Sequence, residues 1–134
     1  MGRIINIRDR ALQSRDAIDL LSNKWRITII HILQEGVLRT NEIQGAISEV
    51  SPKVLTQTLR GMERDGLIYR EIFNVVPPRV EYGLTNMGRS LIKPLVDLCH
   101  WAKAHIAERD QARGKFDLAS KARKASPSKR ASKR

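Results

Sequence analysis

Side chains of the types that commonly bind nucleic acid recur along one short segment of the chain. They are Lys53, Gln57, Arg60 and Arg64, with Thr56 beside them. An α-helix turns by about 100° per residue, so this spacing places all of them on one side. Arg and Lys bind guanine edges and phosphates, and Gln pairs with adenine. The segment predicts a helix that offers hydrogen-bond donors to DNA, although an ordinary solvated helix face would carry the same residue types.

The same segment has an apolar side and defined ends. Ser51 is a suitable N-cap, Pro52 a suitable first helical residue, and Asp65-Gly66 a suitable helix end. We include Ser51 among the candidate DNA-binding residues. The apolar residues that recur at helical spacing opposite the polar side, and that can pack on a core, are Leu55, Leu59 and Met62.

Two segments with a two-residue period follow this helix. Residues 67–73 and 79–84 are therefore predicted to be strands of a hairpin. The loop between them contains Pro77 and Pro78, which fix the backbone and make the loop stiff. Arg70 and Arg79 flank the loop, where they can bind phosphates or reach into the minor groove. We interpret the hairpin as a wing beside a recognition helix, and Arg70 and Arg79 as candidate DNA contacts.

Four motifs of the chain carry a family resemblance. They are Lys24-Trp25, Leu55-Thr56-Gln57-Thr58-Leu59, Asp65-Gly66-Leu67 and the wing motif VPPRVEYGLT, which is long and unusual. Together they resemble the HxlR family of bacterial regulators, a branch of the MarR-like winged-helix proteins, and the likeness extends over roughly residues 11–106. The resemblance implies an α+β fold, mainly helical with a small β-hairpin: a winged helix-turn-helix with a long terminal dimerisation helix.

The chain departs from the family pattern at a few positions. Many members carry a Cys-Pro pair before the first helix, which serves some of them as a redox or electrophile sensor. Residues 11–14 contain no cysteine here, so that sensing route is not transferred. Thr40 replaces the aromatic residue that usually follows an Arg, and Thr58 replaces a common Arg. Gly61 lies inside the recognition helix, at a cost of about 1 kcal/mol against Ala. The target sequence can therefore not be inferred from relatives.

Further elements must position this helix and hairpin. The last predicted helix, capped by Thr85 or Asn86, runs from Met87 to about Glu108. The elements expected before the recognition helix are a helix over residues 17–21 capped by Ser14, a helix over Arg26–Gln34, a strand at Leu38-Arg39 and a helix over residues 41–47 capped by Thr40.

The last predicted helix has a wider apolar stripe than the side of a small domain needs. Such a stripe indicates a partner helix, and the resemblance also implies a homodimer formed through N- and C-terminal helices. Two recognition helices would then read half-sites about 34 Å apart. The alternative is burial of the stripe on its own domain. The residues of the stripe are Leu91, Ile92, Leu95, Val96, Leu98, Cys99, Trp101, Ala102 and Ile106.

The positive charge is concentrated at the C-terminus. The net charge is +11 from 25 basic and 14 acidic residues, and residues 113–134 hold nine of the basic and one of the acidic ones. We expect three parts: an N-terminal arm (residues 1–13), the winged helix-turn-helix domain (14–110) and a basic disordered tail (111–134). The tail either binds DNA phosphates without reading sequence or only adds solubility.

The sequence gives little support for a metal, cofactor or catalytic site. Cys99 and His100 are adjacent, so they point to different sides of a helix, and His105 lies five residues beyond His100. The sequence has no zinc-binding motif and no phosphate-binding Gly-rich loop. We therefore expect no metal, no cofactor and no catalytic residue. The lack of a long apolar segment predicts no membrane contact, and the single cysteine excludes an intramolecular disulfide. We expect a cytoplasmic, nucleoid-associated protein.

These observations favour a homodimeric, sequence-specific transcriptional regulator that binds double-stranded DNA. Repression is favoured over activation, because a protein bound at a promoter blocks polymerase without further contacts. Two alternatives stay open: an architectural protein that coats DNA through its basic tail, and a winged-helix module that binds proteins. A binding site for a small-molecule effector is a further open alternative, although no residue pattern indicates which ligand it would bind.

Overall fold

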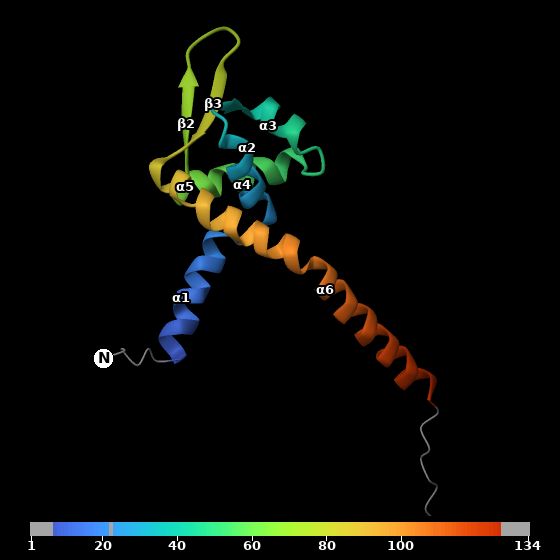
Figure 1. Ribbon diagram of the computed structural model, residues 1–134. Coiled ribbons are helices and arrows are strands. Elements are labelled where there is room, and N and C mark those ends of the chain that lie inside the picture. The colour runs from blue at the N-terminus through green and yellow to red at the C-terminus, as the bar shows by residue number, and fades with distance from the viewer. Residues whose placement is uncertain (1–6, 22, 127–134) are drawn as a thin grey trace, which may run out of the picture. The chain divides into compact units, whose positions relative to one another are not determined.

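The computed structural model describes residues 7–21 and 23–126 and is mainly helical with one small sheet (Figure 1). The chain divides after Leu95 into two compact units. The mainly helical content with one small sheet agrees with the predicted α+β class. The elements in chain order are α1 (Ile7–Leu20), α2 (Lys24–Leu33), β1 (Leu38–Arg39), α3 (Thr40–Ala46), α4 (Pro52–Arg64), β2 (Ile68–Phe73), β3 (Arg79–Leu84), α5 (Asn86–Ser90) and α6 (Ile92–Ala125).

The sheet is antiparallel, with the strand order β1-β3-β2. Strands β2 and β3 form the predicted hairpin, in a register that pairs Ile68 with Leu84 and Phe73 with Arg79. The hairpin extends as a wing beyond α2, α3 and α4 (Figure 1). Strand β1 pairs with β3 and brings Arg39 opposite Glu81. The two predicted hairpin strands and the predicted strand at Leu38-Arg39 are confirmed.

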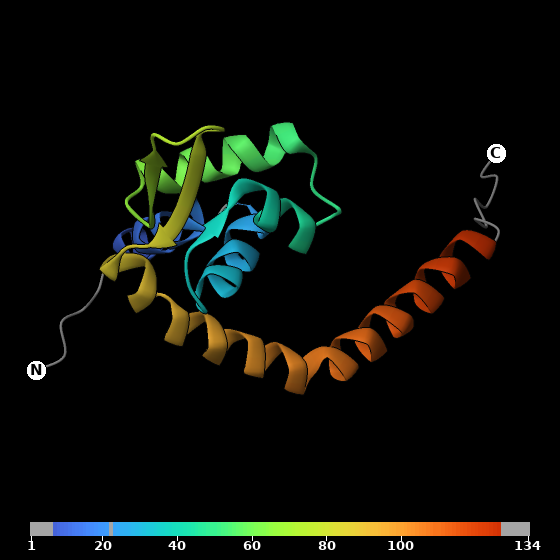
Figure 2. The same cartoon turned by 90° about the horizontal axis from the view of Figure 1, so that it is seen from above.

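The core lies between the sheet and the helices α2, α3 and α4, which gather beside it (Figure 2). Helix α4 packs on α2 and β2. The predicted apolar side of α4 is confirmed, because Leu55, Leu59 and Met62 are almost fully buried. The side chains that α2, α3 and the sheet contribute to this core include Ile29, Ile30, Leu33, Ile43, Ile68, Tyr82 and Leu84.

Local capping chemistry sets the ends of α4. The Ser51 hydroxyl accepts a hydrogen bond from the Val54 amide at 3.2 Å, and Pro52 is the first helical residue. Asp65 is the C-cap, and Gly66 follows with a φ of 75°, a conformation that favours glycine. Both predicted ends of the recognition helix are confirmed.

The substitution Ser51→Ala should lower the free energy of unfolding by about 1 kcal/mol, because the amides of the first turn lose their side-chain acceptor. Urea unfolding followed by circular dichroism measures this change. Ser51→Asp is the matched control, since an Asp side chain caps equally well and should keep the stability near that of the wild type. An equal loss in both variants would contradict a capping role.

Helix α1 begins earlier than predicted. It starts at Ile7 and passes through Ser14, whose hydroxyl donates to the Arg10 carbonyl at 3.0 Å instead of capping a helix. The Arg, Ala, Leu and Gln residues before Ser14 are good helix formers, so the helix continues upstream. Residues 7–13 are therefore helical, whereas residues 1–6 of the predicted arm lie outside the described residues.

The predicted terminal helix is interrupted. Thr85 caps α5 by accepting from the Gly88 amide at 3.0 Å, and a turn at Leu91 separates α5 from α6. Pro94 explains the break: it has no amide proton, and its ring would clash with the Ser90 carbonyl of a continuous helix. The apolar stripe, which crosses this point, gave no sign of the interruption.

Helix α6 is also longer than predicted and ends at Ala125. Residues 111–125, expected to be disordered, are part of it. Their lack of apolar bulk argues against packing in a core, but Ala, Lys, Arg and Gln still favour a helix. Residues 127–134 of the predicted tail lie outside the described residues. None of the helices in the described ranges is long and apolar enough to cross a membrane.

Helices α2 and α3 begin two residues and one residue earlier than predicted. Helix α2 begins at Lys24, because the Asn23 side chain accepts from the Trp25 amide at 2.8 Å. Helix α3 begins at Thr40, so its N-cap is Arg39 instead of Thr40. The Glu42 carboxylate accepts from the Arg39 amide at 3.1 Å and thereby satisfies a group at the helix start.

Candidate nucleic-acid interface

The outer side of α4 carries the predicted DNA-binding residues. Lys53, Gln57 and Arg64 are exposed, and none of them hydrogen-bonds or ion-pairs with another residue of the described ranges. Their polar groups are therefore available to a ligand. Thr56 is also exposed, but its hydroxyl donates to the Pro52 carbonyl at 2.9 Å. Thr56 can thus offer a ligand its methyl group and a hydroxyl lone pair.

Two of the predicted arginines share one carboxylate. Glu63 lies 3.6 Å from Arg60 and 3.4 Å from Arg70, measured between charged atoms. Arg60 remains more than half exposed and can still reach a ligand. Only a quarter of the Arg70 side chain is exposed, and its pairing with Glu63 ties β2 to α4. Arg70 therefore holds the wing against the recognition helix and does not lie at the wing tip.

Arg79 lies on the other face of the hairpin. Side chains alternate between faces along a strand, and Arg70 pairs with Tyr82 while Arg79 pairs with Phe73. The Arg79 guanidinium stacks on the Phe73 ring at 4.5 Å, and its Nε lies 3.2 Å from the Glu81 carboxylate. The two arginines that flank the loop in sequence therefore do not share a surface.

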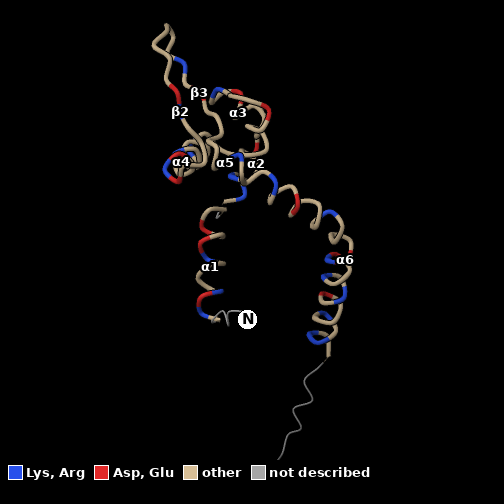
Figure 3. Tube along the Cα trace, turned by 60° about the vertical axis from the view of Figure 1, so that its left-hand side comes forward, with Lys and Arg blue, Asp and Glu red and all other residues tan. Residues whose placement is uncertain are grey.

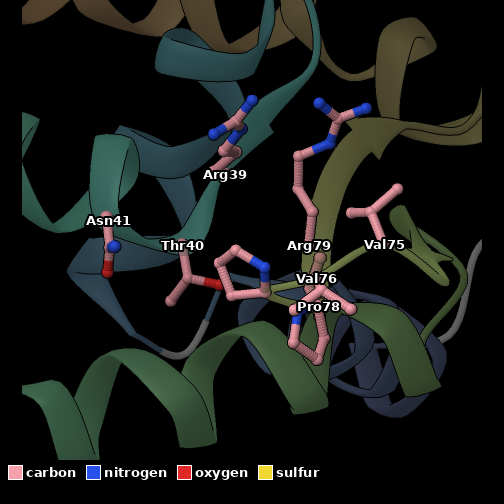
Figure 4. A pocket seen from close by; sticks show the side chains of 9 residues that line it. Arg39, Thr40, Asn41, Val75, Val76, Pro78 and Arg79 are labelled. Carbon is pink, nitrogen blue, oxygen red and sulfur yellow. The ribbon is translucent and has the colours of Figure 1, made fainter.

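A groove of about 460 Å³ separates the wing loop from the start of α3 (Figure 4). Arg39 and Arg79 extend from neighbouring strands towards the same side of the groove. This places an exposed Arg39, which was not among the predicted site residues, beside the wing. The sequence predicted the strand that carries Arg39, but only its pairing with β3 brings Arg39 to Arg79. The remaining lining residues are Thr40, Asn41, Val75, Val76, Pro77, Pro78 and Val80.

The groove combines positive charge with small apolar surfaces. Val75 and Val76 at the wing tip are exposed, Val76 completely. Phosphates bind arginine, whereas the deoxyribose between them has apolar faces. The lining therefore suits a sugar–phosphate backbone, and the wing tip offers shape and apolar contact instead of charge.

The outer part of α6 forms a second basic surface. Lys and Arg recur along α6 with few Asp and Glu between them (Figure 3). One of these cations is partly neutralised, because Arg109 lies 3.0 Å from Asp110. Such a surface attracts phosphates without reading bases. The exposed basic residues of this part are Arg109, Arg113, Lys115, Lys121, Arg123 and Lys124.

The residues considered for a metal site have other neighbours. His105 lies with its Nδ1 2.7 Å from the Trp101 carbonyl, and its ring stacks on Trp101 with 4.6 Å between ring centres. Cys99 is exposed on α6. Across residues 7–21 and 23–126, no three His, Cys, Asp or Glu side chains form a group that could hold a metal.

Comparison with known proteins identifies the family to which the chain is similar. The HxlR-like helix-turn-helix family model matches residues 20–110. The chain is 37% identical to the uncharacterized HTH-type transcriptional regulator YkvN of Bacillus subtilis over 100 residues, which is 75% of this chain and 84% of YkvN.

Solved structures agree with this assignment. A transcriptional regulator of the MarR family from Enterococcus faecalis V583 superposes with a TM-score of 0.67 at 34% identity, covering 82% of this chain and 97% of that one. The redox regulator HypR in its reduced form gives 0.70 at 28% identity, covering 74% and 98%. The fold is thus a winged helix-turn-helix shared with MarR-like regulators, and regulators of this family bind DNA. We conclude that the chain belongs to the HxlR-like helix-turn-helix family and is a transcriptional regulator with a helix-turn-helix DNA-binding domain.

Proposed function

We propose that this protein is a homodimeric repressor that reads a two-fold symmetric DNA site with α4. The observation that carries the proposal is the division of α4 into two sides. One side is fixed in the core by Leu55, Leu59 and Met62. The other side presents Lys53 and Gln57 with unoccupied polar groups. A helix that is rigidly held and offers open donors is suited to base recognition in the major groove.

Each predicted contact has a part in this proposal. Gln57 and Arg60 bind base edges, and Lys53 and Thr56 face the major groove beside them. Ser51 and Arg64 lie at the two ends of α4, where phosphates of the groove walls pass. Arg79 binds backbone beside the wing together with Arg39. Arg70 supports these contacts indirectly, because its ion pair with Glu63 keeps the wing in place beside α4.

Dimerisation is supported by apolar side chains that the described residues leave exposed. Ile7 and Ile18 are exposed on α1, and Leu98, Trp101 and Ile106 are exposed on α6. Helices with uncovered apolar residues commonly pair with another helix. A second copy of the chain offers the same surfaces, so a symmetric dimer would cover both. Repression then requires only that the dimer occupies its site.

Footprinting of selected DNA fragments tests the dimeric site. Protection of two half-sites, with centres about 34 Å or a multiple of this distance apart, is expected. Protection of a single half-site would show that one protomer binds alone.

Removal of residues 121–134 should weaken binding to all DNA sequences by a similar factor. It should also flatten the salt dependence, by about 0.9 in the slope of log K against log salt for each phosphate that the protein no longer binds. Titrations between 50 and 200 mM salt, about the range in which such interactions are revealed, measure both effects. Lys121→Gln, Arg123→Gln and Lys124→Gln together keep the length of the chain and should reproduce part of the change. Unchanged affinity at low salt would exclude a DNA-binding role of the tail.

A further inference from the structure

We propose that a polar seam between α4 and the α1–α2 junction sets the position of the recognition helix, with Arg26 as a positioning residue for base reading. The seam consists of Asn23, Arg26, Thr58, Gly61 and Asp65. This inference rests on the proposed function, because the role of the seam is to position the side of α4 that reads DNA bases. It also accounts for Thr58 and Gly61, the two departures from the family pattern in this helix.

Arg26 joins the end of α4 to the end of α1. Its NH1 lies 2.6 Å from the Asp65 carboxylate and donates to the Leu20 carbonyl at 3.1 Å. Only 12% of the Arg26 side chain is exposed, against 34% of Asp65. A charged pair that is this well shielded is screened far less by salt than a surface pair. The last residue of α1 and the C-cap of α4 are thus held by the same guanidinium group.

Gly61 provides the space for this guanidinium group. A Cβ at position 61 would lie 2.7 Å from the Arg26 NH2, so the guanidinium group would have to move from its present place. A mid-helix glycine costs about 1 kcal/mol against alanine, so its presence calls for a packing reason. The passage of Arg26 across α4 is that reason.

Thr58 forms the second fixed point. It is 5% exposed, and its hydroxyl accepts from the Asn23 side-chain amide at 3.1 Å and donates to the Val54 carbonyl at 2.8 Å. The other end of the Asn23 side chain caps α2. One asparagine therefore fixes the start of α2 and the middle of α4 together. The small hollow beside this contact is also lined by Gln57, so the seam adjoins a proposed base contact.

The two fixed points together define the placement of α4. Thr58 and Asp65 are seven residues apart, which corresponds to about 10.5 Å along a helix. Apolar packing alone tolerates small slides and rotations, whereas two directional polar contacts at this spacing oppose both. Because the Leu20 carbonyl belongs to α1, a change in α1 would be passed to the reading side of α4.

The test compares binding to the selected site with binding to a scrambled duplex of equal length. Arg26→Met and Asp65→Asn should each lower the ratio of the two affinities about tenfold, the worth of roughly one good base contact. Arg26→Lys keeps the charge pair and should lower the ratio less. Arg89→Met removes an exposed positive charge from α5, outside the seam and the interface, and should leave the ratio unchanged.

Thermal unfolding of each variant separates positioning from simple folding. A purely structural role would lower the amount of folded protein and reduce both affinities equally, so an unchanged ratio overturns the proposal. If Arg26→Met does not fold, Asp65→Asn decides, because it removes one charge of the pair and keeps the size of the side chain. If the wild-type protein itself shows no preference for any site, the proposed function fails and the seam is not at issue.

Discussion

The double substitution Gln57→Ala and Arg60→Ala is expected to lower the affinity for the protein's own DNA site at least about 30-fold, since each good base contact is worth about 1–3 kcal/mol. Both side chains project from the exposed side of α4, and neither belongs to the core. The Gln57 amide has no partner within the described residues, so its whole hydrogen-bonding capacity is available to a base. Fold and stability should change little, because surface positions away from caps and buried networks tolerate substitution.

Competition between the selected site and a scrambled duplex measures this effect. Affinity for the scrambled duplex should fall only by the contribution of one charge, because Gln57 carries none. The matched control is Gln111→Ala with Arg89→Ala, which removes the same residue types from exposed positions of α6 and α5. An equal fall in both affinities would show that α4 supplies general attraction to DNA and does not read its sequence.

The second large effect concerns the proposed dimer. Leu98→Glu with Trp101→Glu should convert the proposed homodimer into monomers and lower the affinity for a two-fold symmetric site by about 10²- to 10⁴-fold, because binding to the two half-sites is then no longer linked. Leu98 and Trp101 are 50% and 61% exposed on α6. Burying a carboxylate at such a surface without a partner is costly, so the interface would not form.

Sedimentation analysis and DNA titration of the same samples test this prediction. Lys103→Glu is the matched control: it also changes the charge by two units, and helical spacing places it on the side of α6 opposite Leu98. This control should remain dimeric. A dimer that persists in Leu98→Glu with Trp101→Glu would show that α6 is not the interface, and the source of two-fold binding would have to be sought elsewhere.

Elements with local signals could be predicted from the sequence. The ends of α4 follow from Ser51, Pro52 and Gly66, and the strands β2 and β3 follow from their two-residue period. The predicted helix boundaries were wrong where two signals in the sequence competed. Pro94 marks the break between α5 and α6, but the apolar stripe runs across it. In the outer part of α6, helix propensity prevailed although there is little apolar surface to pack.

The contacts between distant residues could not be predicted in this way. Arg26 and Asp65 are 39 residues apart, and Asn23 and Thr58 are 35 apart, so no local pattern connects them. Arg70 and Arg79 flank the same loop in the sequence, but the strand register places them on opposite faces. Arg39 gained its place beside the wing only through the pairing of β1 with β3.

The central claim is that α4 of a dimer reads a specific DNA site. Its most direct test is selection from a genomic fragment library by the purified protein at near-physiological salt, with and without residues 121–134. We predict a few strongly enriched fragments that share a two-fold symmetric motif and remain enriched after removal of the tail. Uniform binding that disappears with the tail would contradict the claim and would favour a protein that coats DNA through its basic C-terminus.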